Sequence, residues 1–332
     1  MKTRFLALIT AALTLAGCTT VPAVSPDKTP PASQYDTPLV HATTGAQLSV
    51  QQLANEVASA DIVVVGEYHG HHGAHLLQAR LQQALHTHNP NQLLTMEQFN
   101  LDHQQALDDY LAGQTGETEM IEDSQAWDNY RASYRPLVEF ARQHQIPVIA
   151  ANAPANVVRC VGRKGPDYLD HLEAPRREEL PDSPFEDTPA YQQKFVEAIR
   201  GSHGTGEDEL SERMLNTYRA QLLRDNTMAH RILQARARYP QHQVLHVTGT
   251  FHSEERLGTV AALENQAPDL NIVVVSPVEW PKDLAAAPLD GNQSRGDYLY
   301  FIQPLPEAFK DKDRERKAMQ ERFSHSKAVD CE

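Results

Sequence analysis

Carboxylate, amide and imidazole side chains directly follow four short apolar runs of this sequence. Glu67 and His69 follow the first run, Glu97 the second, Asn152 the third and His252 the fourth. In an open parallel sheet, the carboxyl ends of the strands meet at one rim, and ligands bind there. If the runs are strands, the five side chains share that rim. Each of them taken singly is better explained as a helix cap or a satisfied loop residue, and only the set taken together favours a shared site.

Two kinds of chemistry are open to such a rim. Glu67 and His69 are two residues apart, so on an extended segment both side chains point to the same side. With the distant His252 they offer oxygen and nitrogen ligands to a divalent transition metal. With Glu97 added, the same residues form a catalytic set that moves protons as general acids and bases.

Three further histidines, His71, His72 and His75, follow the first run within nine residues of Glu67. His75 falls on the first turn of the next expected helix, close to the rim, whereas His71 and His72 lie in the connecting loop. A role for the two loop histidines in the site and a purely solvated position both remain open.

The elements that must position these residues are strands alternating with helices. Five runs are apolar or β-branched and mostly continuous, as in strands buried on both faces: 62–65, 93–96, 148–151, 244–248 and 272–275. Helical spacing of apolar residues marks 74–86 and 134–143. The pattern predicts an α/β domain with a mainly parallel central sheet flanked by helices.

The region 156–224 breaks this rhythm, because it is rich in Arg, Glu, Asp and Pro and has no strand signal. We expect a mostly helical insertion that leads into a long helix over 208–237. That helix brings Arg224 and Asp225 near the rim if it returns to the sheet, and Met228, one turn further on, is expected in the core.

The amino-terminal segment has the features of a lipoprotein signal peptide. Lys2 and Arg4 precede an apolar stretch over 5–15, and the box LAGC ends at Cys18. The stretch is shorter than the ~20 residues that a permanent membrane span needs. We expect cleavage after residue 17 and acylation, including palmitate, on Cys18; the alternative is a buried amino-terminal helix with a chance cysteine.

The expected mature chain is anchored by lipid alone and has three parts. A Pro-rich tether covers 18–40, a globular domain 41–310 and a charged tail 311–332. Thr19, and not Asp, follows the lipidated cysteine, as in lipoproteins sorted to the outer membrane. We therefore expect an outer-membrane protein that faces the periplasm or the cell surface.

The charge and the cysteine content of the chain indicate which ligands and which compartment to expect. The chain has 30 Lys and Arg against 44 Asp and Glu, and without Lys2 and Arg4 the balance of 28 against 44 gives −16. So acidic a chain is not expected to bind nucleic acid. Once Cys18 is acylated, Cys160 and Cys331 are left in an oxidising compartment, where they either pair or stay as a buried small residue and an inert tail thiol.

Five ordered motifs carry a family resemblance over about residues 45–280. They are GEYHGHHGAHLLQ, MEQF, WDNYRASYRPLVEFARQHQIPVIAANAP, LRDNTMA and VTGTFH. Together they resemble the ChaN family of haem-binding uptake lipoproteins, in the Tiki, TraB and erythromycin-esterase superfamily. The sequence departs from the family pattern GExHDxxxHHxxQ at Gly70, where Asp is usual, and at Ala74, where the first His of a pair is usual.

The resemblance implies a haem-binding protein for iron uptake, with a tyrosine oxygen on the iron, a homodimer that sandwiches haem and an outer-membrane haem or iron receptor as partner. A tyrosine ligates iron as phenolate, which requires nearby positive charge. Tyr130 and Tyr134 stand beside Arg131 and Arg135, whose guanidinium groups would meet haem propionates or stabilise the phenolate. We expect these four residues and His75 to bind haem; alternatively, both tyrosines pack against the sheet and hydrogen-bond locally.

A hydrolase is the second hypothesis. The superfamily includes enzymes, and the retained Glu67, His69 and His252 suit a metal-dependent hydrolase with Glu67 or Glu97 as general base. Three features favour the haem-binding protein: the lipid anchor, the tether and the Tyr–Arg segment, which contains Tyr130, Arg131, Tyr134 and Arg135. The retained acidic residue and imidazoles favour the enzyme. A protein that only supports envelope complexes is a third reading, and it would have a filled pocket at the rim.

Overall fold

An eight-stranded sheet forms the centre of the molecule, in a computed structural model that describes residues 30–203, 211–325 and 331. The strand order is β2-β1-β8-β7-β3-β6-β4-β5. Six neighbouring strands, from β8 to β5, run parallel, and β1 pairs antiparallel with both β8 and β2. The strands are β1 (Leu39–His41), β2 (Gln47–Leu48), β3 (Ile62–Glu67), β4 (Gln92–Asn100), β5 (Val148–Asn152), β6 (Gln243–Gly249), β7 (Ile272–Glu279) and β8 (Tyr298–Ile302).

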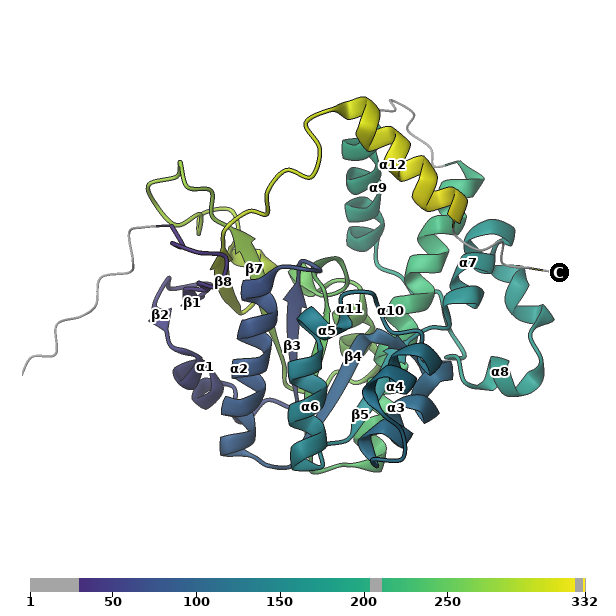
Figure 1. The fold of residues 1–332 in the computed structure, drawn as a ribbon, viewed down its shortest axis with the longest axis horizontal. Helices are drawn as coiled ribbons and strands as arrows, with labels where there is room; N and C mark the ends of the chain where they lie inside the picture. The colour runs from purple at the N-terminus through teal and green to yellow at the C-terminus, as the bar shows by residue number, and fades with distance from the viewer. Residues whose placement is uncertain (1–29, 204–210, 326–330, 332) are drawn as a thin grey trace, which may run out of the picture.

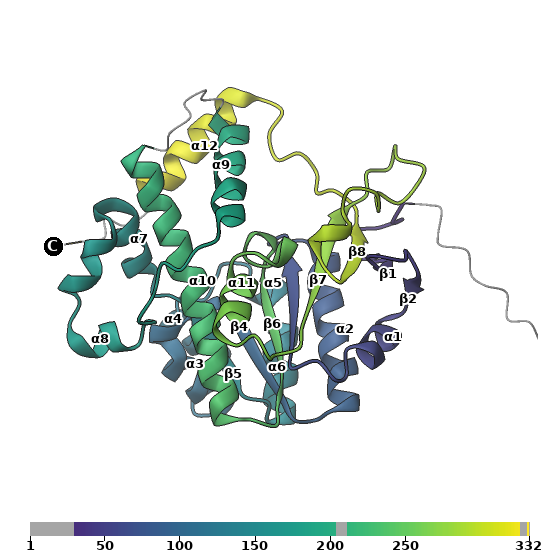
Figure 2. The same cartoon turned by 180° about the vertical axis from the view of Figure 1, so that it is seen from behind.

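Helices cover both faces of this sheet, α2 and α6 on one side and α10 and α11 on the other (Figures 1 and 2). The helices are α1 (Val50–Glu56), α2 (His72–His88), α3 (Gln104–Leu111), α4 (Glu117–Asp123), α5 (Tyr130–Ser133), α6 (Arg135–His144), α7 (Ala155–Lys164), α8 (Ala174–Glu178), α9 (Pro189–His203), α10 (Glu212–Arg238), α11 (Thr259–Gln266) and α12 (Lys312–His325). Short 3-10 helices cover η1 (Leu101–His103), η2 (Pro166–His171), η3 (Thr250–His252), η4 (Glu254–Arg256) and η5 (Gln293–Arg295).

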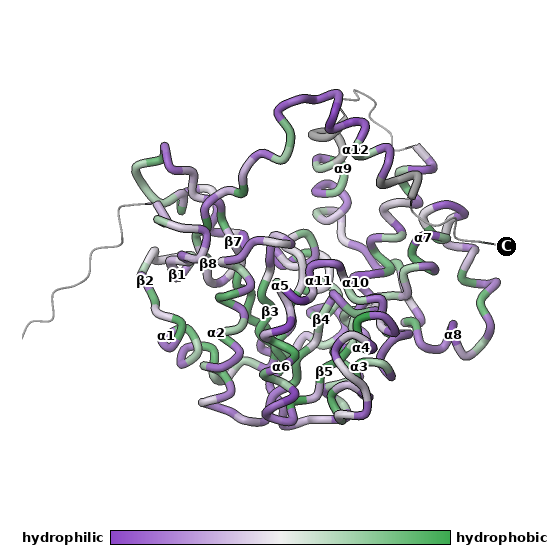
Figure 3. The backbone as a smooth tube through the Cα atoms, in the orientation of Figure 1, coloured by the Kyte–Doolittle hydropathy of each residue, from purple (hydrophilic) through white to green (hydrophobic). Residues whose placement is uncertain are grey.

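Successive residues of β3 point to opposite faces and fill two separate cores. Val63 and Val65 belong to the core shared with α2 and α6, while Ile62 and Val64 belong to the core shared with α10 and α11. All four are fully buried, and Figure 3 shows hydrophobic residues along the central strands. Burial on both faces explains why these strands read as continuous apolar runs.

The expected α/β class and the five expected strands are confirmed, and each strand contains its predicted residues and extends beyond them at one or both ends. The sequence does not anticipate β1, β2 and β8. Strands β1 and β2 contain three and two residues, too few to show a periodicity. Strand β8 is five buried residues, YLYFI, whose composition favours a strand.

The helical insertion is also confirmed, since α7, α8 and α9 lead into α10, which spans Glu212–Arg238 against the expected 208–237. Cys160 and Cys331 form a disulfide, so the pairing alternative is the correct one. The expected tail 311–332 contains α12, and its end is cross-linked to α7.

The carboxyl-terminal boundary of the tether at residue 40 is wrong, because Leu39 and Val40 are buried in β1 and pair with β8. Residues that are paired in the sheet belong to the domain. The signal peptide and Cys18 lie outside the described residues. Among the described residues, no helix is both long and apolar enough to span a membrane.

Candidate functional site

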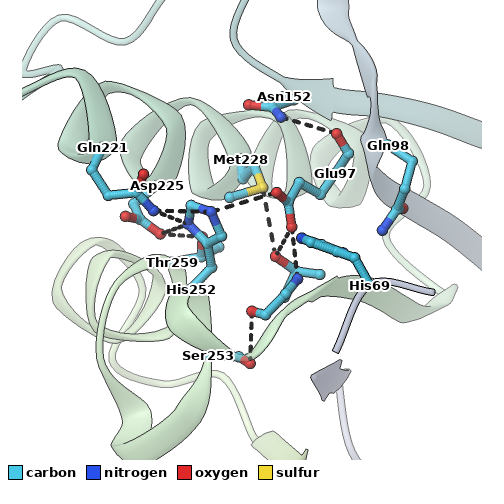
Figure 4. Close-up of polar contacts among 12 residues, drawn as sticks. His69, Glu97, Gln98, Asn152, Gln221, Asp225, Met228, His252, Ser253 and Thr259 are labelled. Carbon is cyan, nitrogen blue, oxygen red and sulfur yellow. Dashed lines mark hydrogen bonds and ion pairs between the residues drawn. The ribbon is translucent and has the colours of Figure 1, made fainter. Parts of the chain in front are cut away.

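The carboxyl ends of β3, β4 and β6 bring the candidate residues together, as expected for neighbouring parallel strands. Glu67 is the last residue of β3, Glu97 lies in β4, and His252 ends the 3-10 turn η3 that follows β6. Figure 4 shows Glu97 between His69 and His252, with Asp225 on the other side of His252. The rim predicted from the sequence therefore exists, and it is largely buried.

Glu67 is a buried carboxylate surrounded by donors. Its Oε1 accepts hydrogen bonds from His69 Nδ1 at 2.8 Å and from the Tyr134 hydroxyl at 2.6 Å. Its Oε2 accepts one from Gln78 Nε2 at 2.7 Å, and His75 Nδ1 lies 3.4 Å away. Burial works against ionisation, but the hydrogen bonds and charges of His69 and His75 hold the pKa of Glu67 at about 2. Glu67 is therefore ionised, and its hydrogen bond holds the His69 ring in place.

His69 is the accessible member of this pair, with a side chain 44% exposed. Its ring meets Trp127 edge-on at 4.8 Å between centroids. Burial lowers the pKa of His69, but the Glu67 hydrogen bond and the charges of Glu97 and Glu67 outweigh it and raise the pKa. The other ring edge lies over Gly249, where an added Cβ would stand 2.9 Å from Nε2. Glycine at 249 thus leaves room for the imidazole.

Glu97 is a second buried carboxylate, between the two histidines. Its Oε2 accepts hydrogen bonds of 2.7 Å from the Gly249 amide and from the Thr248 hydroxyl, and its Oε1 lies 3.5 Å from His252 Nε2. Burial raises its pKa, but the positive charge of His252 and His69 and these donors bring it below the ordinary value. Glu97 is held as an anion facing two imidazoles.

His252 is paired with Asp225 from the returning helix α10. His252 Nδ1 donates to Asp225 Oδ1 at 2.7 Å, and the hydroxyls of Tyr191 and Thr259 also donate to Asp225, at 2.6 and 2.9 Å. Burial lowers the pKa of His252, but the charges of Asp225 and Glu97 outweigh it and raise the pKa. The expectation that α10 brings Asp225 to the rim is confirmed. Met228 is fully buried, as expected for a core residue.

Of the remaining polar residues of the motifs, three form hydrogen bonds with backbone groups and one is exposed. Asn152 donates from Nδ2 to the carbonyl of Glu97 at 3.0 Å. His71 is buried; its Nε2 donates to the carbonyl of Gln303 at 2.8 Å, and its Nδ1 caps α2. His72 is exposed on the first turn of α2. His75 is buried beneath the loop, where it accepts a hydrogen bond from the Gly70 amide.

The Tyr–Arg segment lies differently from the arrangement that haem ligation requires. Tyr134 and Tyr130 are buried, and burial together with nearby carboxylates raises the pKa of both phenols. Arg131 and Arg135 both pair with Glu117 on α4. The spacing explains the difference: Tyr130 and Tyr134 are four residues apart and turn inward together, whereas Arg131 and Arg135, one position further along, face α4.

The metal set predicted from the sequence is split between two pairs. Glu67 and His69 form one pair, while His252 faces Asp225 and Glu97. Over residues 30–203, 211–325 and 331, no group of three or more His, Cys, Asp or Glu side chains is arranged to hold a metal ion. The metal site stays a prediction.

Several contributors to the site are missed by the sequence reasoning. Gln78 and Gln98 both donate to Glu67, Gln221 lies 3.0 Å from His252 Nε2, and Trp127 packs on His69. Gln98 directly follows a residue that the sequence singles out, and adjacency was a usable signal for it. Gln78 and Trp127 also had a signal, because they stand at the end of the motif GEYHGHHGAHLLQ and at the start of the motif WDNYRASYRPLVEFARQHQIPVIAANAP. Gln221 lies on α10 outside the quoted motifs and had no sequence signal.

Comparison with known proteins places this arrangement in a family. A family model described as haem-binding uptake, Tiki superfamily, ChaN matches residues 53–263, which contain every rim residue described above. No curated protein matches the chain.

One solved structure shares the fold, and two others show a weaker similarity. ChaN of Campylobacter jejuni, described as binding haem cofacially, has a TM-score of 0.62 at 16% identity and covers 83% of this chain and 100% of its own. A protein from Bacillus cereus has a TM-score of 0.45 at 11% identity, covering 81% of this chain and 95% of its own. The erythromycin esterase EreC in its open conformation has a TM-score of 0.43 at 12% identity, with 86% of both chains covered.

Proposed function

Because this chain belongs to the haem-binding uptake family ChaN of the Tiki superfamily, we propose that it is a lipid-anchored protein that binds haem and supports haem or iron uptake. The observation that carries the proposal is the family match over residues 53–263. The cofacial haem binding described for the Campylobacter jejuni protein supports a dimer that sandwiches haem here as well.

The anchor and the location complete the proposal. Cys18 at the end of the LAGC box is the acylation site, and the Pro-rich segment that follows spaces the domain from the outer membrane. A lipid-anchored domain at that membrane can pass haem to or from an outer-membrane receptor. Labelling cells with a palmitate analogue tests the anchor: the chain should be labelled, and Cys18→Ser should not.

The tyrosines proposed as iron ligands do not fit haem as they lie here. A phenolate ligand needs an open coordination direction and a lowered pKa, whereas the Tyr134 hydroxyl donates to Glu67 and the pKa of both Tyr134 and Tyr130 is raised. Ligation by Tyr134 therefore requires that it leave Glu67 and turn toward solvent. We retain Tyr130 and Tyr134 as proposed ligands that this rearrangement would expose.

A haem titration followed by absorbance tests the proposed function. The purified protein should bind haem and develop a tyrosinate-type spectrum, and Tyr134→Phe, Tyr130→Phe or the double variant should change it. Trp127→Phe is a suitable control, because it keeps an aromatic ring beside His69 and removes no oxygen ligand. Absence of any haem spectrum would reject the haem-binding function, and an unchanged spectrum in the double variant would reject only the ligands.

A hydrolase is the second candidate, and one observation favours it. Two carboxylate–histidine pairs, Glu67–His69 and Asp225–His252, flank the ionised Glu97 at a buried rim. Each carboxylate orients its imidazole and favours the protonated form, as in general acid–base catalysis. Haem binding by a tyrosine has no use for this arrangement. In this reading His69, which is accessible, is the base or acid that meets a substrate.

An ester and peptide substrate panel tests the hydrolase reading, with metal ions added and removed in separate arms. Activity that is lost in His69→Gln and His252→Gln, but kept in His72→Gln, would support it. His72 is a good control because it is close to His69 in the sequence and is exposed on the first turn of α2. An inactive wild type that binds haem would leave the first proposal alone.

A further inference from the structure

The guanidinium group of Arg224 lies beside the rim. No acceptor among the described residues binds it. It lies on α10, three residues after Gln221 and four before Met228, on the helix face that contacts His252 and Thr248. It is only partly exposed. Within residues 30–203, 211–325 and 331, neither a hydrogen bond nor an ion pair holds it.

The nearest carboxylates do not serve as its partners, because other donors occupy them. Glu97 and Asp225 lie within electrostatic range of Arg224, as does the like charge of Arg159. Glu97 accepts from the Gly249 amide and the Thr248 hydroxyl, and Asp225 accepts from His252 and two hydroxyls. Both carboxylates are satisfied without the guanidinium.

An unpaired guanidinium in a partly desolvated position costs free energy unless an anion meets it. Such a group persists where it receives a ligand, and its fork of N–H donors suits a carboxylate in bidentate geometry. Arg131 and Arg135 differ from Arg224, because Glu117 already engages both.

We propose that Arg224 is the residue that binds a carboxylate group of the ligand at this rim, and that under the proposed haem-binding function this group is a haem propionate. The inference rests on that function for the identity of the ligand. It assigns propionate recognition to the rim of the parallel sheet and to α10, away from the Tyr–Arg segment.

The test compares haem with its dimethyl ester, in which both propionates are uncharged, on the purified full-length protein in one buffer. The wild type should bind haem about tenfold or more tightly than the ester, as expected for charged hydrogen bonds. Arg224→Gln should bind both alike, near the wild-type affinity for the ester. Arg224→Lys should fall between, because it keeps the charge and loses the fork.

Arg159→Gln is the matched control, since Arg159 is exposed and contributes only a distant like charge. The preference of this variant for haem over the ester should differ from that of the wild type by less than about twofold. Thermal melting tests whether Arg224 has a structural role instead. The melting temperature of Arg224→Gln should be no lower than that of the wild type, because the substitution removes no contact with a described partner.

The outcomes separate the two proposals. Haem and ester bound equally by the wild type, or a preference retained in Arg224→Gln, would overturn the role of Arg224 and leave haem binding intact. A wild type that binds neither compound would overturn the proposed function and this inference with it. Should Arg224→Gln melt lower, the structural explanation is correct, unless Arg224→Lys melts normally and still shows a reduced preference.

Discussion

Neutralising Glu67 is the most direct test of the site's electrostatics. In Glu67→Gln the shape of the side chain is nearly kept, but one carboxylate oxygen becomes an amide that faces donors. The hydrogen bonds from His69, Tyr134 and Gln78 all point at Glu67. At least one of these donors then meets another donor at a position that is 1% exposed.

The pKa of Glu67 sets the size of the effect. A pKa lowered from 4.5 to about 2 in the folded state corresponds to about 3 kcal/mol of stabilisation by the ionised form. A carboxyl group whose folded pKa is depressed contributes this free energy fully above its unfolded pKa, near 4.5. The contribution is lost as pH falls from there toward about 2. Glu67→Gln should therefore unfold about 3 kcal/mol more easily at pH 7 and lack this part of the acid dependence.

Guanidinium unfolding with the disulfide intact, at pH 7 and at several values between pH 5 and pH 2, measures both quantities. Glu117→Gln is the control, a carboxylate paired with arginines near the surface, whose loss should cost at most about 1 kcal/mol. NMR titration adds a second readout, a lower pKa for His69 in Glu67→Gln. Equal midpoints for Glu67→Gln and wild type at pH 7, or an unchanged acid dependence, would refute the reasoning.

Three further substitutions probe other contacts. Asp225→Asn should lower the pKa of His252 and cost about 2–4 kcal/mol, because a buried ion pair loses its charge; an unchanged NMR titration of His252 would contradict this. Gly249→Ala should displace His69, since the new Cβ would stand 2.9 Å from its Nε2, and a crystal structure with the imidazole unmoved would argue against it. Cys331→Ser should cost about 2–5 kcal/mol by freeing a loop of 171 residues, seen as a lower guanidinium midpoint that reductant reproduces in the wild type.

Much of the fold is readable from the sequence, because local patterns suffice for it. The apolar runs that become β3 to β7 are long enough to mark strands, and helices between them require a parallel sheet. The parallel arrangement in turn gathers Glu67, Glu97 and His252 at one rim, so the site's location follows from strand order alone. The short strands β1 and β2 are not predicted, since strands of three and two residues show no periodicity.

What the sequence by itself determined was therefore which backbone positions meet at the rim and which two cysteines could pair. Only the tertiary structure decided which side chains contact one another. Tyr134 contacts Glu67 and Arg135 contacts Glu117 because distant elements pack against them, and Arg224 has no partner among the described residues because other donors fill its neighbouring carboxylates. The physical reason is that a strand's position depends on local burial and pairing, whereas a side chain's partner depends on where distant elements pack.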